Sequence, residues 1–210
     1  MPKIKGLLFD WDGTLVDSVW AMYLGACNVF RESGLPIPDF PVFCATCFSP
    51  YAQYYHAFGV TASGEQILEW YRAAYVAERK FFPDAIGFVK SIAARGPLFS
   101  LGGIHLGIIS ASNRAKIEHA CREVGIVEHF HMIVGDADEK IEPIKLFCRQ
   151  NGILPGEALF IGDFVSDVRD AFAAGVIPVG ITRGKNTAEV LKHAGANFVI
   201  DTLEELLPLL

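Results

Sequence analysis

The segment IKGLLFDWDGTLVDS, residues 4–18, carries two carboxylates two positions apart, directly after an apolar run. Residues 4–9 show the continuous hydrophobicity of a strand that is buried on both faces. A buried carboxylate without a partner costs several kcal/mol, so we expect Asp10 to lie at a sheet edge, to be paired, or to be bound to a cation. Asp12 lies on the same side of an extended chain, and Gly13 permits the tight turn that follows.

Further apolar runs indicate that this first strand belongs to a parallel sheet. They alternate with helical patterns, and the helical patterns each end at a glycine: Gly125, Gly152 or Gly175. Alternating strands and helices predict an α/β fold with a doubly wound parallel sheet. The predicted strands are residues 4–9, 106–110, 131–135, 158–163, 177–181 and 197–200, and the predicted helices include 113–124, 142–151 and 166–174.

The interval between the first two predicted strands is far longer than one crossover helix requires. Residues 17–82 are helical in character, rich in aromatic side chains, and punctuated by proline and glycine. We therefore predict an α-helical cap domain at 17–82, inserted into an α/β core formed by 1–16 and 83–210.

Composition narrows the classes of function. The chain has 210 residues and a formal net charge of −6, without a basic cluster, so we expect no nucleic-acid partner and no membrane partner. No run approaches the ~20 apolar residues that span a bilayer, and no secretory signal precedes the first strand. Five cysteines, an odd number, favour reduced thiols and a cytoplasmic protein. Cys44 and Cys47 form a CxxC without a second metal-binding pair, and we interpret them as packed side chains.

Polar side chains follow several of the predicted strands. Ser110 ends the second strand, and Lys140 lies in the loop after the third. Asp163 ends the fourth, with Asp167 one helical turn beyond it. The carboxyl ends of parallel strands meet at one edge, so these groups should converge with Asp10. A carboxylate nucleophile, oxygen ligands for a hard cation and donors for phosphoryl oxygens are what phosphoryl transfer requires.

Three motifs resemble those of the haloacid dehalogenase-like phosphatases. DWDGTLVDS (10–18) resembles their DxDGTLxDS signature, IISAS (108–112) their Ser/Thr motif, and GDFVSDVRDAFAAG (162–175) their GDxxxD motif. FFPDAIGFVKSIAARG (81–96) is similar to the segment that follows the cap in this family. The resemblance spans nearly the whole chain and is closest to the phosphoglycolate phosphatase-like branch.

This resemblance implies a role for each group. Asp10 attacks phosphorus and becomes an aspartyl-phosphate, and Asp12 protonates the departing alcohol and then activates water. Mg²⁺ takes oxygens from Asp10 and Asp163 and the backbone carbonyl of Asp12. Asp167 holds a metal-bound water or Lys140. The implied phosphate-binding set is Asp10, Gly13, Ser110, Ala111 and Lys140. The implied partner is a small-molecule phosphate ester, for a monomer or homodimer.

Two departures from the family pattern affect these assignments. The third motif is commonly Lys-Pro-x-Pro, and here it reads Lys140-Ile141-Glu142-Pro143, so we assign the lysine role to Lys140 with Lys145 as the alternative. The connection GPLFSLGGIH, residues 96–105, is longer than usual and precedes a strand. We expect it at the amino edge of the sheet, away from the chemistry.

Several alternatives stay open at this level. A dehalogenase lacks an acid at the position of Asp12, and the phosphonate-cleaving branch needs a cap lysine, whereas no lysine occurs between Lys5 and Lys80. A sugar-phosphate mutase has the same motifs, and a phospho-accepting regulator has similar groups but needs neither Asp12 nor a cap. Arg72 is the cap residue that could bind a substrate carboxylate.

Local structural roles explain other polar and aromatic residues. We interpret Asp17 and Ser18 as helix caps, and His129 and His131 as surface and strand-start histidines. A helical stripe of aromatic residues should form the cap's own core: Tyr51, Tyr54, Tyr55 and Phe58.

Overall fold

The chain folds into two units joined by two crossings of the backbone. The computed structural model describes residues 3–48, 50–74, 80–94 and 103–210. The first unit contains Met1–Asp17 and Phe81–Leu210, and the second contains Ser18–Lys80. These limits differ by one or two residues from the predicted boundaries, 1–16 with 83–210 for the core and 17–82 for the cap.

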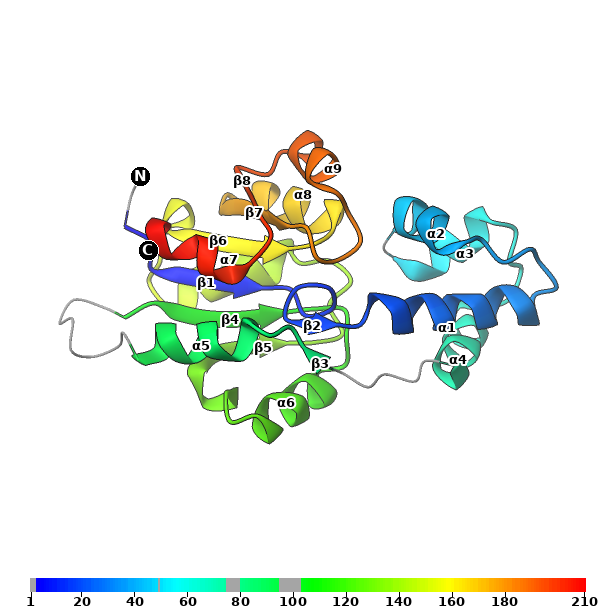
Figure 1. Cartoon of the computed structure of the whole chain (residues 1–210), viewed down its shortest axis with the longest axis horizontal. Coiled ribbons are helices and arrows are strands. Elements are labelled where there is room, and N and C mark those ends of the chain that lie inside the picture. The colour runs from blue at the N-terminus through cyan, green and yellow to red at the C-terminus, as the bar shows by residue number, and fades with distance from the viewer. Residues whose placement is uncertain (1–2, 49, 75–79, 95–102) are drawn as a thin grey trace. The chain divides into compact units, whose positions relative to one another are not determined.

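A six-stranded sheet forms the centre of the first unit, with its strands in the order β5-β4-β1-β6-β7-β8 (Figure 1). All neighbouring strands are parallel, which confirms the predicted α/β fold with a parallel sheet. The strands are β1 (Gly6–Phe9), β4 (His105–Ile109), β5 (Phe130–Val134), β6 (Ala158–Gly162), β7 (Ile177–Ile181) and β8 (Phe198–Ile200).

Helices cover both faces of this sheet, as the continuous hydrophobicity of its strands requires. Side chains of α5 and α6 pack on one face together with those of η3, and side chains of α7 and α8 pack on the other. The elements are α5 (Ala85–Ala94), α6 (Arg114–Glu123), η1 (Val127–His129), α7 (Ile141–Gln150), η2 (Pro155–Glu157), α8 (Val165–Ala174), α9 (Ala188–Ala194) and η3 (Leu203–Leu209).

The strand register brings three chain segments to one edge of the sheet. Phe9 of β1 lies opposite Ile108 of β4 and Ile161 of β6. The residues that follow these three strands therefore emerge side by side at the carboxyl edge. This edge lies where the chain order reverses, because β1 pairs with β4 on one side and with β6 on the other.

The second unit is helical and has its own aromatic core. Its helices are α1 (Val19–Glu32), α2 (Phe40–Thr46), α3 (Tyr51–Ala57) and α4 (Gly64–Ala74). Tyr54 and Tyr55 are buried and Tyr51 is partly buried against this core, as the aromatic stripe predicts, whereas Phe58 is 39% exposed. Cys47 is buried in the same core, next to the partly buried Cys44.

A short two-stranded sheet, β2 (Val16–Asp17) and β3 (Lys80–Phe81), marks the two crossings of the chain. Within the described residues, none of the helices combines the length and apolar character that crossing a bilayer demands. Most of the long connection predicted at 96–105 lies outside the described residues, and His105 begins β4.

Candidate active site

Asp10 and Lys140 form a buried ion pair at the carboxyl edge of the sheet. Lys140 Nζ lies 2.5 Å from Asp10 Oδ1 and 2.7 Å from Asp167 Oδ1. Burial alone lowers the pKa of an ammonium group, but Asp10 and Asp167 hold the pKa of Lys140 above its ordinary value. Burial raises the pKa of Asp10 well above its usual range; the charge of Lys140 opposes this rise, and the charges of Asp167 and Asp163 add to it.

Local structure explains why Lys140 reaches this position. The residue directly precedes α7, and its backbone N–H donates to Asp170 Oδ2 on α8 at 3.1 Å. Its side chain then enters the buried site. Lys145, the alternative for this role, instead pairs with Glu142 on the exposed side of α7, with Nζ and Oε1 3.0 Å apart.

Asp167 belongs to the first turn of α8. Its Oδ2 accepts the backbone N–H of Phe164 at 3.1 Å, which satisfies one of the free donors at the start of the helix. Its other oxygen, Oδ1, remains available to Lys140. One carboxylate therefore both caps the helix and pairs with the lysine, and a Cβ atom at Gly162 would collide with it.

Asp163 lies between two glycine loops, one of which contains Gly13 and the other Gly184. Its Oδ2 accepts the backbone N–H of Lys185 at 2.7 Å. A Cβ atom on Gly13 would lie 2.5 Å from the same oxygen, and one on Gly184 would be closer still. Burial, reinforced by the charge of Asp167, raises the pKa of Asp163 to about 7, although Lys185 opposes the shift.

The charge of this cluster fits a divalent cation. Asp10, Asp163 and Asp167 are all buried, and each offers a carboxylate oxygen within 4.8 Å of the other two. When all three are ionised, Lys140 neutralises one charge and leaves an excess of two negative charges. Oxygen donors of this kind suit a hard cation such as Mg²⁺. The residues that are present therefore fit the metal that the resemblance implies.

Asp12 lies beside a serine that the sequence analysis did not single out. Ser112 Oγ donates to Asp12 Oδ2 at 2.5 Å. Ser110 is buried, and its Oγ accepts the backbone N–H of Ser112 at 3.0 Å. Ala111, between the two serines, is partly buried. The carboxylate of Asp12 is thus bound by the Ser110–Ser112 loop, and the three-carboxylate cluster is formed without it.

The loop after β5 forms hydrogen bonds with the backbone of Ser110 and Ser112. The backbone N–H of Asp136 donates to the Ser112 carbonyl at 2.9 Å, and that of Ala137 to the Ser110 carbonyl at 3.0 Å. Asp136 has a φ of +56°, a region that non-glycine residues rarely adopt. Its side chain accepts hydrogen bonds from Asn113 at the start of α6. The strained residue thereby joins two loops of the site.

The predicted cap residue Arg72 lies on α4 in the second unit, where it is exposed. His131, interpreted as a strand-start residue, lies near the beginning of β5 with its ring 4.4 Å from that of His105. Neither residue belongs to the carboxylate cluster of the first unit.

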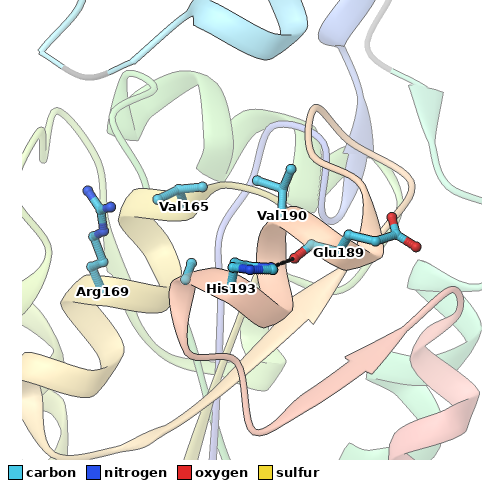
Figure 2. Close-up of a pocket in the computed structure, with 6 residues that line it drawn as sticks. Val165, Arg169, Glu189, Val190 and His193 are labelled. Atoms are coloured by element: carbon cyan, nitrogen blue, oxygen red, sulfur yellow. Dashed lines mark hydrogen bonds between the residues drawn. The ribbon is translucent and has the colours of Figure 1, made fainter.

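A cavity of about 310 Å³ lies between α8 and α9, shown in Figure 2. Val165 and Arg169, one turn apart on α8, line it, whereas Asp167 lies on the opposite face of that helix. The cavity therefore does not contain the carboxylate cluster. Its lining residues are Val165, Arg169, Glu189, Val190, His193 and Ala194.

Residues 7–181 match the family model of the haloacid dehalogenase-like hydrolases. A phosphoglycolate phosphatase of Yersinia pseudotuberculosis is 25% identical over 221 residues, covering 98% of this chain and 92% of the relative. The tyrosine-protein kinase PtkA of Mycobacterium tuberculosis is 25% identical over 214 residues, covering 96% and 72%.

The fold itself occurs in a solved haloacid dehalogenase-like family hydrolase from Streptococcus pneumoniae. Its TM-score is 0.80 at 23% identity, covering 100% of this chain and 99% of that one. Similarity at this level extends across both units of the chain.

Proposed function

Because the chain belongs to the haloacid dehalogenase-like hydrolase family, we propose that it is a Mg²⁺-dependent phosphatase that hydrolyses a small-molecule phosphomonoester. The observation that carries the proposal is the buried cluster at the carboxyl edge of the sheet. There Asp10 lies 2.5 Å from a lysine and within reach of two further carboxylates. This arrangement supplies a nucleophile, a counter-charge and a metal site together.

The proposed reaction has two steps. In the first, an Asp10 oxygen forms a bond to phosphorus while the bond to the ester oxygen breaks, and Asp12 gives its proton to the departing alcohol. In the second, Asp12 takes a proton from water, whose oxygen attacks phosphorus and releases inorganic phosphate and the Asp10 carboxylate. Ser110 and Lys140 donate to the phosphoryl oxygens during both steps.

The residues that would hold Mg²⁺ are Asp10, Asp163 and the backbone of Asp12, with Asp167 beside them. A bound Mg²⁺ supplies positive charge that stabilises the phosphoryl group as its charge redistributes. Lys140 donates to both Asp10 and Asp167, and its positive charge opposes the rise in the pKa of Asp10 that burial causes.

One named relative suggests a substrate class, and a second supports the type of reaction. The phosphoglycolate phosphatase relative favours a small phosphorylated acid, and we propose such an ester as the first substrate to test. The relative named as a kinase supports phosphoryl transfer more generally, because a kinase and a phosphatase differ in the acceptor of the group. A sugar-phosphate mutase or a phospho-accepting regulator would form the same acyl phosphate and differ in its fate.

The experiment is phosphate release from a panel of small phosphomonoesters that includes 2-phosphoglycolate. The purified chain is assayed with Mg²⁺, with EDTA, and as Asp10→Asn. We expect turnover that requires Mg²⁺ and is lost in the variant. Isomerisation of a sugar phosphate without phosphate release would favour the mutase, and a stable phosphoprotein without turnover would favour the regulator.

A further inference from the structure

Arg183 binds the loop that follows the Asp12 carboxylate. It lies between β7 and α9, and two of its guanidinium nitrogens donate to the Thr14 carbonyl, Nε at 3.1 Å and Nη2 at 2.5 Å. The third nitrogen, Nη1, donates to both Asp84 oxygens at 2.5 and 2.6 Å. The guanidinium lies over the Phe82 ring, 4.3 Å from its centroid. Every nitrogen of this group is therefore engaged.

The Thr14 carbonyl belongs to a closed turn that contains Asp12. The backbone N–H groups of Thr14, Leu15 and Val16 all donate to the Trp11 carbonyl, and that of Gly13 donates to the Val16 carbonyl. These hydrogen bonds make residues 11–16 a single compact turn. A shift of the Thr14 carbonyl would therefore also move the backbone of Asp12 and Gly13.

The same arginine precedes the second loop that holds Asp163. Gly184 follows Arg183 and packs on the Asp163 carboxylate, and the next backbone N–H, from Lys185, donates to it. Gly13 packs against the same carboxylate from the 11–16 turn. The Arg183 side chain thus joins the two loops between which Asp163 lies.

We propose that Arg183 is a positioning residue, which fixes the distance between these two loops and so aims the Asp163 carboxylate at the metal. It does so without adding charge to the site, because Asp84 neutralises it. Asp84 is anchored in turn by the backbone N–H of Leu203 at 2.8 Å. Burial raises the pKa of Asp84, but the hydrogen bonds from Arg183 and Leu203 outweigh burial and hold that pKa below its ordinary value.

The test compares two variants that disturb the ion pair differently. Arg183→Met removes the bonds to both Thr14 and Asp84. The matched control Asp84→Asn removes the negative charge of the pair but leaves an amide oxygen as an acceptor for Arg183, and it leaves both hydrogen bonds from Arg183 to the Thr14 carbonyl. Mg²⁺ binding to the full chain is measured by calorimetry without substrate, beside the melting temperature. Should Arg183→Met fail to fold, the double variant Arg183→Met with Asp84→Asn, which has no unpaired charge, takes its place.

We expect Arg183→Met, or the double variant, to bind Mg²⁺ at least tenfold more weakly than wild type. The Mg²⁺ affinity of Asp84→Asn should stay within about twofold of wild type. Both results should hold whatever the melting temperatures of the variants are. Equal Mg²⁺ affinity in all variants, or a loss in both that follows the melting temperature, would overturn the proposal. So would a wild-type chain that binds no Mg²⁺.

The inference rests on the proposed function only for its metal. If the wild type binds Mg²⁺ but releases no phosphate from any ester, the phosphatase proposal fails. The comparison of Mg²⁺ affinities still decides the role of Arg183.

Discussion

Replacement of Gly13 by alanine tests whether the two glycine loops position Asp163. Gly13 has a φ of +76°, and a left-handed backbone costs an alanine roughly 1–2 kcal/mol. Its new Cβ would also lie 2.5 Å from Asp163 Oδ2, where ordinary contact begins at 3.4 Å. The carboxylate or the turn must therefore give way by about 0.9 Å.

A matched control separates these two effects. Gly125 has a φ of +65°, and a Cβ placed there would meet nothing within 4 Å. Gly125→Ala therefore has the backbone cost alone. A displacement near 1 Å at a reacting centre costs about 10² in rate, equivalent to about 2.7 kcal/mol in the barrier.

The assay measures kcat at saturating Mg²⁺, the Mg²⁺ concentration for half-maximal activity, and the free energy of unfolding. We expect both variants to lose about 1–2 kcal/mol of unfolding free energy from the backbone term. Only Gly13→Ala should lose about a hundredfold in kcat and need more Mg²⁺. If the two variants match in kcat and in Mg²⁺ dependence, the loop that contains Gly13 does not position Asp163.

Three further predictions concern the buried charges and their neighbours. Lys140→Met leaves Asp10 and Asp167 unpaired, so we expect the metal-free protein to lose about 3–5 kcal/mol in unfolding free energy; unchanged melting would contradict this. The pKa of Asp163, about 7 when folded, exceeds its unfolded value, so metal-free stability from this group should fall as pH rises from about 4 to 7. A stability profile over that range that Asp163→Asn leaves unchanged would contradict this assignment. Ser112→Ala should lower kcat roughly tenfold, which corresponds to about 1.4 kcal/mol in the activation barrier. Ser112→Thr keeps the hydroxyl and should keep most of the activity. Equal rates in the two variants would contradict a role for the Ser112–Asp12 hydrogen bond.

The sheet and most of its helices could be predicted from the sequence, because a parallel sheet requires unbroken apolar runs and these are visible in a single chain. Two limits of these elements differ from the prediction. The helix predicted from residue 113 begins at Arg114, since the Asn113 side chain caps it by accepting the Lys116 N–H at 3.4 Å. The strand predicted from residue 4 begins at Gly6.

The assembly of Asp10, Lys140, Asp163 and Asp167 could also be anticipated, because each follows a strand or begins the next helix at the same edge. Ser112 was missed, although a signal existed. Ser110 and Ser112 have the same two-residue spacing as Asp10 and Asp12, on a neighbouring strand.

The contacts of Arg183 could not be predicted. They join residues that are about 100 and 170 positions apart in sequence, and an arginine in a loop is usually solvated. Only the three-dimensional arrangement shows that its donors meet one carbonyl and one carboxylate. The positive φ of Asp136 is likewise a property of the folded loop.

A burst experiment with p-nitrophenyl phosphate separates the two proposed roles, phosphoryl transfer by Asp10 and proton transfer by Asp12. Nitrophenolate leaves without a proton, so Asp12→Asn should still form the aspartyl-phosphate and then hydrolyse it slowly. We expect a burst approaching one nitrophenolate per chain in Asp12→Asn and none in Asp10→Asn. Steady turnover without a burst in Asp12→Asn, or a burst that survives Asp10→Asn, would exclude these roles.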